Sequence, residues 1–374
     1  MIRRTRVEVD LAAIVDNARA VHDLAKTSVY AVVKADAYGH GAIAVAQALT
    51  RAKAVVGFAV SLVEEGVALR DAGVASPILV MGPSQHGGED EIIRSSLTPV
   101  IASHDDLAAL ASAAKRHDQP VDAHLKVDTG MGRLGVAVEE AGEVARDAAA
   151  AGVRVVGLMT HFACADSDDP RDPDSMTRAQ LARFADADRI VTASGATIQV
   201  RHAANSSGAL MFPEARFDLV RTGIAIYGNG RWPAGARPTQ AMRLVTEVAQ
   251  IRTIPVGGTV GYGATWRAAR PTRIAVLPLG YADGLPRRAT GHAEAAIRGV
   301  RVKLIGVISM DIAIADITDA PQIALGDAAV LLGRASDGAS ITTAEYGGWA
   351  GLTEYEVTCG MSKRVPRTYV GDPP

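Results

Sequence analysis

Cysteine is scarce in this chain: only Cys164 and Cys359 occur among 374 residues, far apart in the sequence. They form no disulfide framework of the kind found in small secreted proteins, and they fit a reducing compartment. A run of about 18 or more apolar residues is also missing, so no membrane-spanning helix is expected. The basic N-terminus, residues 1–10, lacks the apolar core of a signal peptide. We therefore expect a soluble, cytoplasmic protein.

An excess of charge of either sign is absent as well. The 39 Lys and Arg residues balance 41 Asp and Glu residues, which gives a net charge of -2. This composition does not favour nucleic acid or an anionic membrane as a partner. Hydrophobic residues make up 48% of the chain, enough for substantial cores. Because 374 residues exceed the usual size of one compact domain, two domains are expected.

The first part of the chain alternates between strand-like and helix-like runs. Most of the strand-like runs are continuously apolar, as expected for parallel strands that are buried on both faces. Eight such units in residues 1–235 predict an α/β domain with a (β/α)8 TIM-type barrel. The alternative is a doubly wound open sheet, but no Gly-x-Gly-x-x-Gly follows the first strand. The candidate strands are 29–34, 55–60, 77–82, 97–102, 122–128, 154–162, 198–204 and 219–227.

The pattern changes after a connection rich in turn residues at 229–242. Beyond it, short strand-like runs are separated by Gly and Pro, which predicts a second, mainly β domain over residues 236–374. One short helix is expected near 343–350. The candidate strands are 243–254, 259–261, 272–278, 295–304, 305–317, 328–333, 354–360 and 365–370.

One lysine lies where a barrel would place its active site. The first barrel strand ends at Val33, Lys34 follows, and turn-forming residues come next. The carboxyl ends of barrel strands carry the active site, and burial there frees a lysine amine to act as a nucleophile or base. The alternative is a lysine whose ammonium reaches the solvent at the rim of the barrel.

Other candidate functional residues recur at the ends of later strands. Arg133, after the fifth strand, offers a planar fork to a carboxylate, although an ordinary surface arginine is as plausible from position alone. His161, after the sixth, is more often a satisfied polar group than a catalyst. Ser206, after the seventh, opens a helix whose N-terminal amides favour an anion. Gly223, after the eighth, allows close approach of a ligand, and barrels often bind phosphate at these last two strands.

Several of these segments resemble motifs of the alanine racemase family. Residues 32–41 (VVKADAYGHG) closely resemble the motif that binds pyridoxal 5'-phosphate in that family. Two positions depart from the common pattern: Asp36, where many members have Asn, and Ile312, where many have Gln. The resemblance covers nearly the whole chain, and its further segments follow in family order at 126–135, 220–228, 260–264, 309–311, 354–356 and 365–367.

The resemblance implies an isomerase that interconverts L-alanine and D-alanine and supplies D-alanine for bacterial peptidoglycan. Lys34 is implied to bind the cofactor as an aldimine. Because racemisation removes a proton from one face and returns one to the other, Tyr262 is implied as the second acid/base. The further cofactor-binding residues implied are Tyr38, His161, Asn205, Ser206, Arg221, Gly223, Ile224 and Tyr355. Substrate binding is implied for Arg133 and Met310, with support from Lys126 and Asp311, and no metal is expected.

Two of these residues carry particular chemical consequences. In the family the arginine matching Arg221 hydrogen-bonds the pyridine nitrogen of the cofactor, with the histidine matching His161 in support. Since arginine stays protonated, it keeps that nitrogen from gaining a full proton, which weakens the electron sink and favours simple proton exchange over transamination. The lysine matching Lys126 is carbamylated in some members and holds the arginine that corresponds to Arg133.

The resemblance also implies a head-to-tail homodimer in which each active site combines Lys34 of one chain with Tyr262 of the other. Three rival functions remain open. A pyridoxal-dependent amino-acid decarboxylase on the same barrel would carry a carboxylate at the pyridine nitrogen, where this sequence has Arg221. A non-catalytic, single-domain cofactor-binding protein would lack the β domain. A racemase with broader specificity for serine, lysine or arginine is poorly distinguished by sequence.

Overall fold

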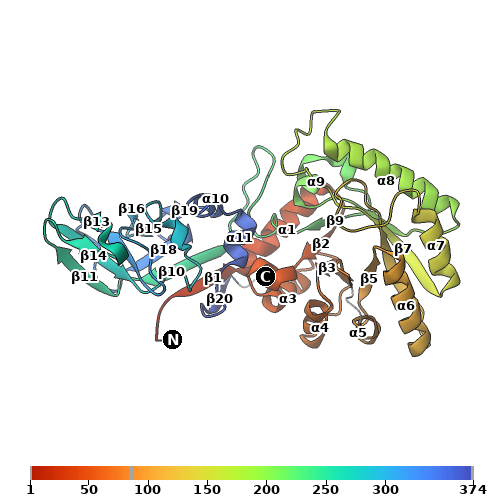
Figure 1. Ribbon diagram of the computed structural model, residues 1–374, viewed down its shortest axis with the longest axis horizontal. Helices are drawn as coiled ribbons and strands as arrows, with labels where there is room; N and C mark the ends of the chain where they lie inside the picture. The colour runs from red at the N-terminus through yellow and green to blue at the C-terminus, as the bar shows by residue number, and fades with distance from the viewer. Residues whose placement is uncertain (1, 84–86, 372–374) are drawn as a thin grey trace. The chain divides into compact units, whose positions relative to one another are not determined.

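The computed structural model describes residues 2–83 and 87–371, and the chain packs as two units (Figure 1). One unit consists of Ile14–Thr239. The other combines the segment up to Ala13 with the chain from Gln240 onward. The sequence predicted domains of 1–235 and 236–374, so the structure differs from it mainly in giving the N-terminal segment to the second unit.

The first unit is built on an eight-stranded parallel sheet in the order β8-β7-β6-β5-β4-β3-β2-β9. Each predicted barrel strand overlaps one observed strand. The last strand in the chain, β9, pairs with β2, in the register that sets Arg221 opposite Tyr30. The strands are β2 (Ser28–Val32), β3 (Gly57–Val60), β4 (Ile78–Val80), β5 (Thr98–Ile101), β6 (Val121–Lys126), β7 (Val153–Met159), β8 (Val200–His202) and β9 (Leu219–Thr222).

Two backbone hydrogen bonds join the ends of this sheet. The amide of Asp218 donates to the carbonyl of Arg201 at 3.1 Å, and the amide of Arg221 donates to that of Ala204 at 3.0 Å. They connect β8 to β9 and so close the ring. The predicted (β/α)8 barrel is confirmed, and the carboxyl ends of its strands meet at one mouth.

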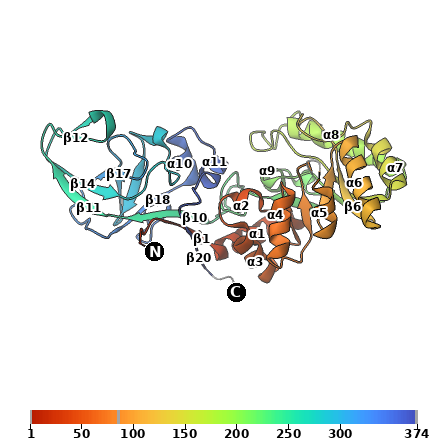
Figure 2. The same cartoon turned by 60° about the horizontal axis from the view of Figure 1, so that its bottom comes forward.

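Helices lie around the outside of the barrel strands (Figure 2). Ser103 caps one of them, because its Oγ accepts from the amide of Asp106 at 3.1 Å. At the start of another, the carboxylate of Glu65 accepts from the amides of Ser61 and Leu62. The helices are α1 (Leu11–Ala25), α2 (Lys34–Tyr38), α3 (Ala42–Arg51), α4 (Val63–Asp71), α5 (Glu89–Arg94), α6 (His104–His117), α7 (Ala141–Ala150), α8 (Met176–Ala193) and α9 (Ser206–Met211), with a 3-10 turn at Pro213–Ala215.

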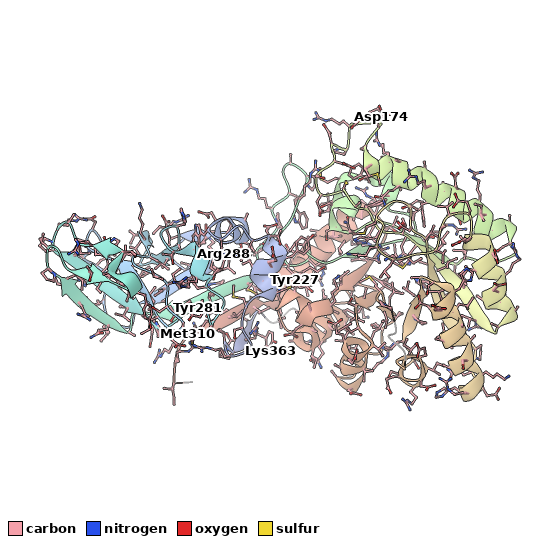
Figure 3. All side chains as sticks on the ribbon, in the orientation of Figure 1. Asp174, Tyr227, Tyr281, Arg288, Met310 and Lys363 are labelled. Atoms are coloured by element: carbon pink, nitrogen blue, oxygen red, sulfur yellow. The ribbon has the colours of Figure 1, made fainter. Side chains whose placement is uncertain are left out.

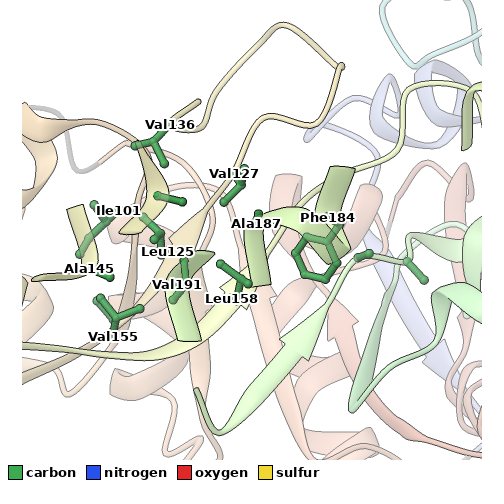
Figure 4. Close-up of a cluster of buried hydrophobic side chains, with 14 of the residues drawn as sticks. Ile101, Leu125, Val127, Val136, Ala145, Val155, Leu158, Phe184, Ala187 and Val191 are labelled. Carbon is green, nitrogen blue, oxygen red and sulfur yellow. The ribbon is translucent and has the colours of Figure 1, made fainter. Parts of the chain in front are cut away.

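A large apolar core joins the strands to the surrounding helices. Leu125 and Leu158 from adjacent strands pack in one buried cluster with Phe184, Ala187 and Val191 of α8 (Figure 4). Each fully buried side chain of this size contributes roughly 1.5–3 kcal/mol relative to an exposed one. This packing supports the rigid strand ends that carry the functional residues.

The second unit is mainly β, as predicted, with sheet orders β16-β15-β18-β10-β1-β20, β11-β14-β17 and β12-β13, and β19 beside β18. Its strands are β1 (Arg6–Asp10), β10 (Met242–Glu247), β11 (Gln250–Ile254), β12 (Thr259–Val260), β13 (Trp266–Arg267), β14 (Thr272–Leu277), β15 (Glu294–Ile297), β16 (Val300–Lys303), β17 (Ala313–Asp316), β18 (Ala328–Arg334), β19 (Ser340–Ile341) and β20 (Arg367–Val370). Helix α10 spans Thr343–Gly348, α11 spans Glu354–Cys359, and 3-10 turns lie at Tyr262–Ala264 and Arg287–Ala289.

Three features of this unit correct the sequence prediction. Strand β1 pairs with β10 and β20, so the N-terminal strand belongs to the β unit. The segment 354–360 is a helix rather than a strand, because Thr353 and Glu356 form a reciprocal capping box at its start. The segment 295–304 is a hairpin that turns at Arg298 and Gly299, which both have positive φ.

Candidate active site

The residues after Lys34 form a left-handed turn. Ala35, Asp36, Ala37 and Tyr38 have φ between 52° and 54°. The amide of Gly39 donates to the carbonyl of Ala35 at 3.0 Å and so closes a helical turn of the wrong hand for L-residues. Such a conformation costs about 1–2 kcal/mol for each non-glycine residue. Strain of this kind persists only where surrounding contacts fix it, and it clusters at functional sites.

Contacts from several elements hold this turn. The amide of Ala35 donates to the Glu65 carboxylate at 2.6 Å, and the carboxylate of Asp36 accepts from the amide of Ala42 at 2.8 Å. The buried imidazole of His40 donates from Nδ1 to the carbonyl of Ala37 at 2.8 Å. The turn therefore fixes the backbone on both sides of Lys34, which is only partly exposed at the end of β2.

The buried side chain of Tyr38 lies against the loop after β9. A Cβ atom on Gly223 would stand only 2.4 Å from the Tyr38 hydroxyl, so only glycine fits there. The hydroxyl of Ser206 accepts from the amides of Gly223 at 3.1 Å and Ala225 at 3.3 Å. Asn205 caps α9, since its Oδ1 accepts from the amide of Gly208 at 2.9 Å. Hydroxyl and amide donors thus gather at the ends of β8 and β9, a setting that suits an anion.

Arg221 is 2% exposed and is held by several acceptors at once. Its Nη1 donates to Nδ1 of His202 at 2.6 Å, and its Nη2 donates to the carbonyl oxygens of Thr160 at 2.7 Å and Ala203 at 3.0 Å. Nδ1 of His161 lies 3.3 Å from Nη2. Nε of Arg221 is buried and has no hydrogen-bond partner among the described residues. Burial lowers the pKa of Arg221 to about 9, so the side chain remains a cation at neutral pH.

Two histidines that sequence reasoning did not single out for a role extend this network. Because a guanidinium can only donate, Nδ1 of His202 must accept, and its proton sits on Nε2. That proton is directed to Nδ1 of His124 at 2.8 Å. Burial and the charge of Arg221 lower the pKa of both imidazoles, that of His124 to about 4, so both are neutral. The feature of the sequence that could have identified His124 and His202 is a polar residue at an inward position of a predicted barrel strand.

Lys126 ends β6 and is only 5% exposed. Its pKa falls to about 8, mainly because of burial and further because of the positive charges of Arg133, Arg221 and Lys34, while Asp128 opposes the shift. The pKa of His161 is also lowered, mainly by burial and further by the same cations. The structure therefore brings the predicted residues at the ends of β2, β6, β7 and β9 into one electropositive cluster.

Asp128 shapes the loop that presents Arg133. Its Oδ1 accepts from the amides of Gly130 at 2.9 Å, Met131 at 2.9 Å and Gly132 at 3.1 Å. Burial raises the pKa of the Asp128 carboxyl, but these backbone bonds outweigh it and lower the pKa. The loop amides therefore donate to an ionised carboxylate. Arg133 follows at the exposed end of the loop, where its guanidinium is accessible to a carboxylate.

The remaining predicted residues lie in the β unit. Tyr262 is 72% exposed on the turn after β12, where Gly261 has φ of 77° and packs against the amide of Val307. Met310 is 51% exposed, and its carbonyl accepts from the amide of Ala282 at 3.0 Å. Figure 3 labels Met310 and Tyr281 on this unit.

Two further predicted residues of the β unit have clear local settings. Asp311 accepts from Arg364 at 2.5 Å, and the same guanidinium binds the buried carboxylate of Asp283. Tyr355 lies partly exposed on α11. Tyr262, Met310, Asp311 and Tyr355 therefore belong to one unit, and the lysine, arginine and histidine cluster belongs to the other.

Two negative findings apply to residues 2–83 and 87–371. No group of three or more His, Cys, Asp or Glu side chains in this part of the chain is arranged to hold a metal ion. None of its helices combines the length and the apolar character that crossing a membrane requires.

Both units match known protein families. Residues 9–230 match the family model "Alanine racemase, N-terminal domain", and residues 241–369 match "Alanine racemase, C-terminal domain". An alanine racemase of Sorangium cellulosum is 42% identical over 383 residues, covering 98% of this chain and 99% of that protein. One of Symbiobacterium thermophilum is 40% identical, covering 99% of this chain and 98% of that protein.

Solved structures agree with these matches. The alanine racemase from D-cycloserine-producing Streptomyces lavendulae superposes with a TM-score of 0.92 at 34% identity, covering 99% of this chain and 97% of that one. The biosynthetic alanine racemase of Pseudomonas aeruginosa has a TM-score of 0.84 at 34% identity, covering 98% of this chain and 99% of that one. The similarity thus extends over both units.

Proposed function

The chain belongs to the alanine racemase family, and from this premise we propose that it interconverts L-alanine and D-alanine with pyridoxal 5'-phosphate bound at Lys34. The observation that carries the proposal is the buried Nε of Arg221, an N–H donor without a partner among the described residues. A pyridine nitrogen is an acceptor of the kind that this donor needs, and a buried donor left unpaired would cost about 1–3 kcal/mol.

The rest of the barrel site fits the same cofactor. The hydroxyls of Tyr38 and Ser206 and the amide of Ile224 are suited to its phosphate, at the strand ends where barrels often bind phosphate. The amide of Gly223, which donates to Oγ of Ser206 at 3.1 Å, would exchange that acceptor for a phosphate oxygen. Asn205 fixes the start of α9 beside them. Tyr355 is proposed as a further phosphate contact, by analogy with the family.

The cofactor, when bound, makes the α-proton of an amino acid acidic by drawing electrons into its ring. Arg221 donates to the ring nitrogen and keeps its own proton at neutral pH, since its pKa stays near 9. Its charge opposes protonation of the nitrogen and so limits the electron withdrawal. Return of a proton then competes well with transamination and decarboxylation.

Two groups exchange the proton in this scheme. The Nζ amine of Lys34 serves one face of the substrate and the Oη of Tyr262 serves the other. Arg133 and the backbone of Met310 hold the substrate carboxylate, which keeps the α-carbon between the two bases. Lys126 supports Arg133, and Asp311 supports the Met310 segment through its ion pair with Arg364.

We further propose a homodimer in which Lys34 of one chain and Tyr262 of the other complete each site. The product D-alanine would serve peptidoglycan synthesis. The high exposure of Tyr262 supports a role outside its own unit, because an exposed tyrosine on a tight turn has little structural use there.

A racemisation assay over a panel of single-enantiomer amino acids tests the proposal. Alanine should be racemised from both directions, with activity that depends on added pyridoxal phosphate after dialysis against a carbonyl scavenger. Borohydride should then fix the cofactor to the peptide that contains Lys34. Faster turnover of serine, lysine or arginine, or release of carbon dioxide, would favour one of the rival functions, and label on Lys126 would refute the assignment of Lys34.

A further inference from the structure

Gln180 of α8 is fully buried and its amide group is fully used in hydrogen bonds. Its Nε2 donates to the carbonyl of His161 at 3.0 Å and to Oγ1 of Thr129 at 3.2 Å. Its Oε1 accepts from the backbone amide of Ala163 at 2.9 Å. Since a backbone N–H can only donate, the contact with Ala163 fixes which end of the side-chain amide carries the oxygen.

These bonds continue toward the cofactor site. Oγ1 of Thr129 accepts from Gln180 and also shares a hydrogen bond with Oγ1 of Thr160 at 2.8 Å. The carbonyl of Thr160 in turn accepts from Nη2 of Arg221 at 2.7 Å. Arg183, one turn further along α8, donates to the carbonyl of Thr129 at 2.9 Å. One helix thus ties the loop after β6 to the end of β7.

We propose that Gln180 is a positioning residue of the racemase site, whose amide sets the ends of β6 and β7 so that His161 and Arg221 are held in place for the cofactor ring. This inference rests on the proposed function. Gln180 itself is assigned no contact with substrate or cofactor. Its effect is transmitted by the carbonyl of Thr160, which orients the Arg221 guanidinium, and by the carbonyl of His161.

The chemistry of the site requires an amide at this position. A glutamate of the same shape could still accept from Ala163, but it has no proton for the carbonyl of His161 when ionised. A methionine would leave the amide of Ala163 and the carbonyl of His161 unpaired in a buried place. Either loss should reduce a function that depends on Arg221 by about tenfold or more.

The experiment compares Gln180→Glu and Gln180→Met with Val191→Ala in the holoenzyme. Val191 lies on the same helix, fully buried in the apolar core, so its truncation lowers stability without altering the hydrogen bonds. Three quantities are measured: the melting temperature, the Kd for pyridoxal phosphate from absorbance titration, and kcat and KM for alanine. Both Gln180 variants should raise that Kd and lower kcat by about tenfold, whereas Val191→Ala should lower only the melting temperature.

A pH profile separates positioning from simple loss of stability. A buried glutamate has a raised pKa, and its protonated form can again donate to the carbonyl of His161. The Kd of Gln180→Glu, divided by that of the wild type, should therefore fall toward one as the pH is lowered, while the ratio for Gln180→Met should stay constant. A constant ratio for both variants would overturn the proposal.

Thr129 provides a second route if the Gln180 variants do not fold. Thr129→Val keeps the shape but removes the hydroxyl between Gln180 and Thr160, whereas Thr129→Ser retains it. The valine variant should bind the cofactor several-fold more weakly and the serine variant should match the wild type. If the wild type is active and every variant keeps its cofactor affinity and kcat within twofold of it, the role of Gln180 is refuted while the proposed function stands. A wild type that binds no pyridoxal phosphate would overturn the proposed function as well.

Discussion

At the scale of single residues, Arg221 is the group whose chemistry is most constrained. It is buried among two histidines and two backbone carbonyls, and four hydrogen bonds set the plane of its guanidinium. The neutral state of His202 and His124 matters here, because a second cation beside Arg221 would raise the electrostatic cost of burial. Among the described residues, Nε is the nitrogen of this guanidinium that has no hydrogen-bond partner.

Replacing Arg221 with glutamate tests its proposed influence on the cofactor. A carboxylate would favour protonation of the ring nitrogen and stronger electron withdrawal, so Arg221→Glu should racemise alanine roughly a hundredfold more slowly. It should also release pyruvate through side transamination. Coupled assays for D-alanine and pyruvate measure both.

Arg221→Lys is the matched control, because it keeps the positive charge but loses the fork. It should be slow without releasing more pyruvate than the wild type. Unchanged rate and unchanged pyruvate in Arg221→Glu would show that Arg221 does not face the ring nitrogen.

Lys126 should react with carbon dioxide near neutral pH. Its pKa of about 8, lowered from 10.5, means that its ammonium loses the proton at a lower pH than an ordinary lysine, and only the neutral amine forms a carbamate. The adjacent cations Arg133, Arg221 and Lys34 would stabilise the resulting negative charge. Labelled bicarbonate should therefore give a carbamate carbon signal in NMR that grows between about pH 6 and pH 8.

Lys126→Arg cannot form the carbamate and should remove that signal. Both Lys126→Arg and Lys126→Ala should raise KM for alanine by about tenfold, since Arg133 would lose the negative carbamate that holds it. A signal that persists in Lys126→Arg would place the carbamate elsewhere.

At the scale of elements, the left-handed turn after β2 is strained at the backbone of residues 35–38. Four successive non-glycine residues occupy a region that glycine adopts without penalty. The turn nevertheless places Lys34 at the strand end and buries Tyr38 against Gly223. The strained backbone lowers the stability of the turn, but it sets the positions of Lys34 and Tyr38 in the site.

Ala35→Gly should relieve part of this strain. Ala35 is exposed and has φ of 52°, so glycine removes a cost of about 1–2 kcal/mol and loses part of the gain through the entropy of the unfolded chain. We expect the free energy of unfolding to rise by about 0.5–1 kcal/mol, measured by urea titration of the apoprotein.

Ala108→Gly is the matched control on the right-handed helix α6. It should lower the free energy of unfolding by about 1 kcal/mol. A loss of similar size in Ala35→Gly would mean that the turn is not left-handed in solution.

At the scale of the whole molecule, the two proposed bases belong to different units, Lys34 to the barrel and Tyr262 to the β unit. Subunit mixing tests whether they come from different chains. Inactive Lys34→Ala and Tyr262→Ala proteins are mixed and allowed to exchange subunits. In a mixed dimer with shared sites, one site collects both defects and the other collects neither. With free and equal exchange, mixed dimers make up about half of the population, so about a quarter of all sites should be intact. Racemase activity after mixing is the measurement.

The control mixes Lys34→Ala with the double variant Lys34→Ala, Tyr262→Ala. No site in that mixture can obtain Lys34, so activity should stay at background. If the first mixture also stays inactive after exchange is demonstrated, each chain builds its own site.

The sequence by itself determined the barrel, the β unit and the positions of the strand-end residues. Continuous apolar runs mark strands that are buried on both faces, and each run is read locally, without knowledge of the partner strand. The same local character explains the error at 354–360, where the capping pair Thr353 and Glu356 outweighed a strand-like composition. Lys34, Arg133 and His161 were found because each lies at or just after the end of such a run, whereas Arg221 was identified through the family resemblance.

Tertiary structure alone decided which of these residues meet and what supports them. Arg221, His202 and His124 come from three strands, and their shared proton arrangement exists only once the barrel has closed. Gln180 is far from any strand end in the sequence, yet its amide spans two of them. Strand β1 joins the β unit because its partners β10 and β20 lie over 200 residues away in the chain. Hydrogen bonds across such separations depend on packing, which periodicity along the chain does not encode.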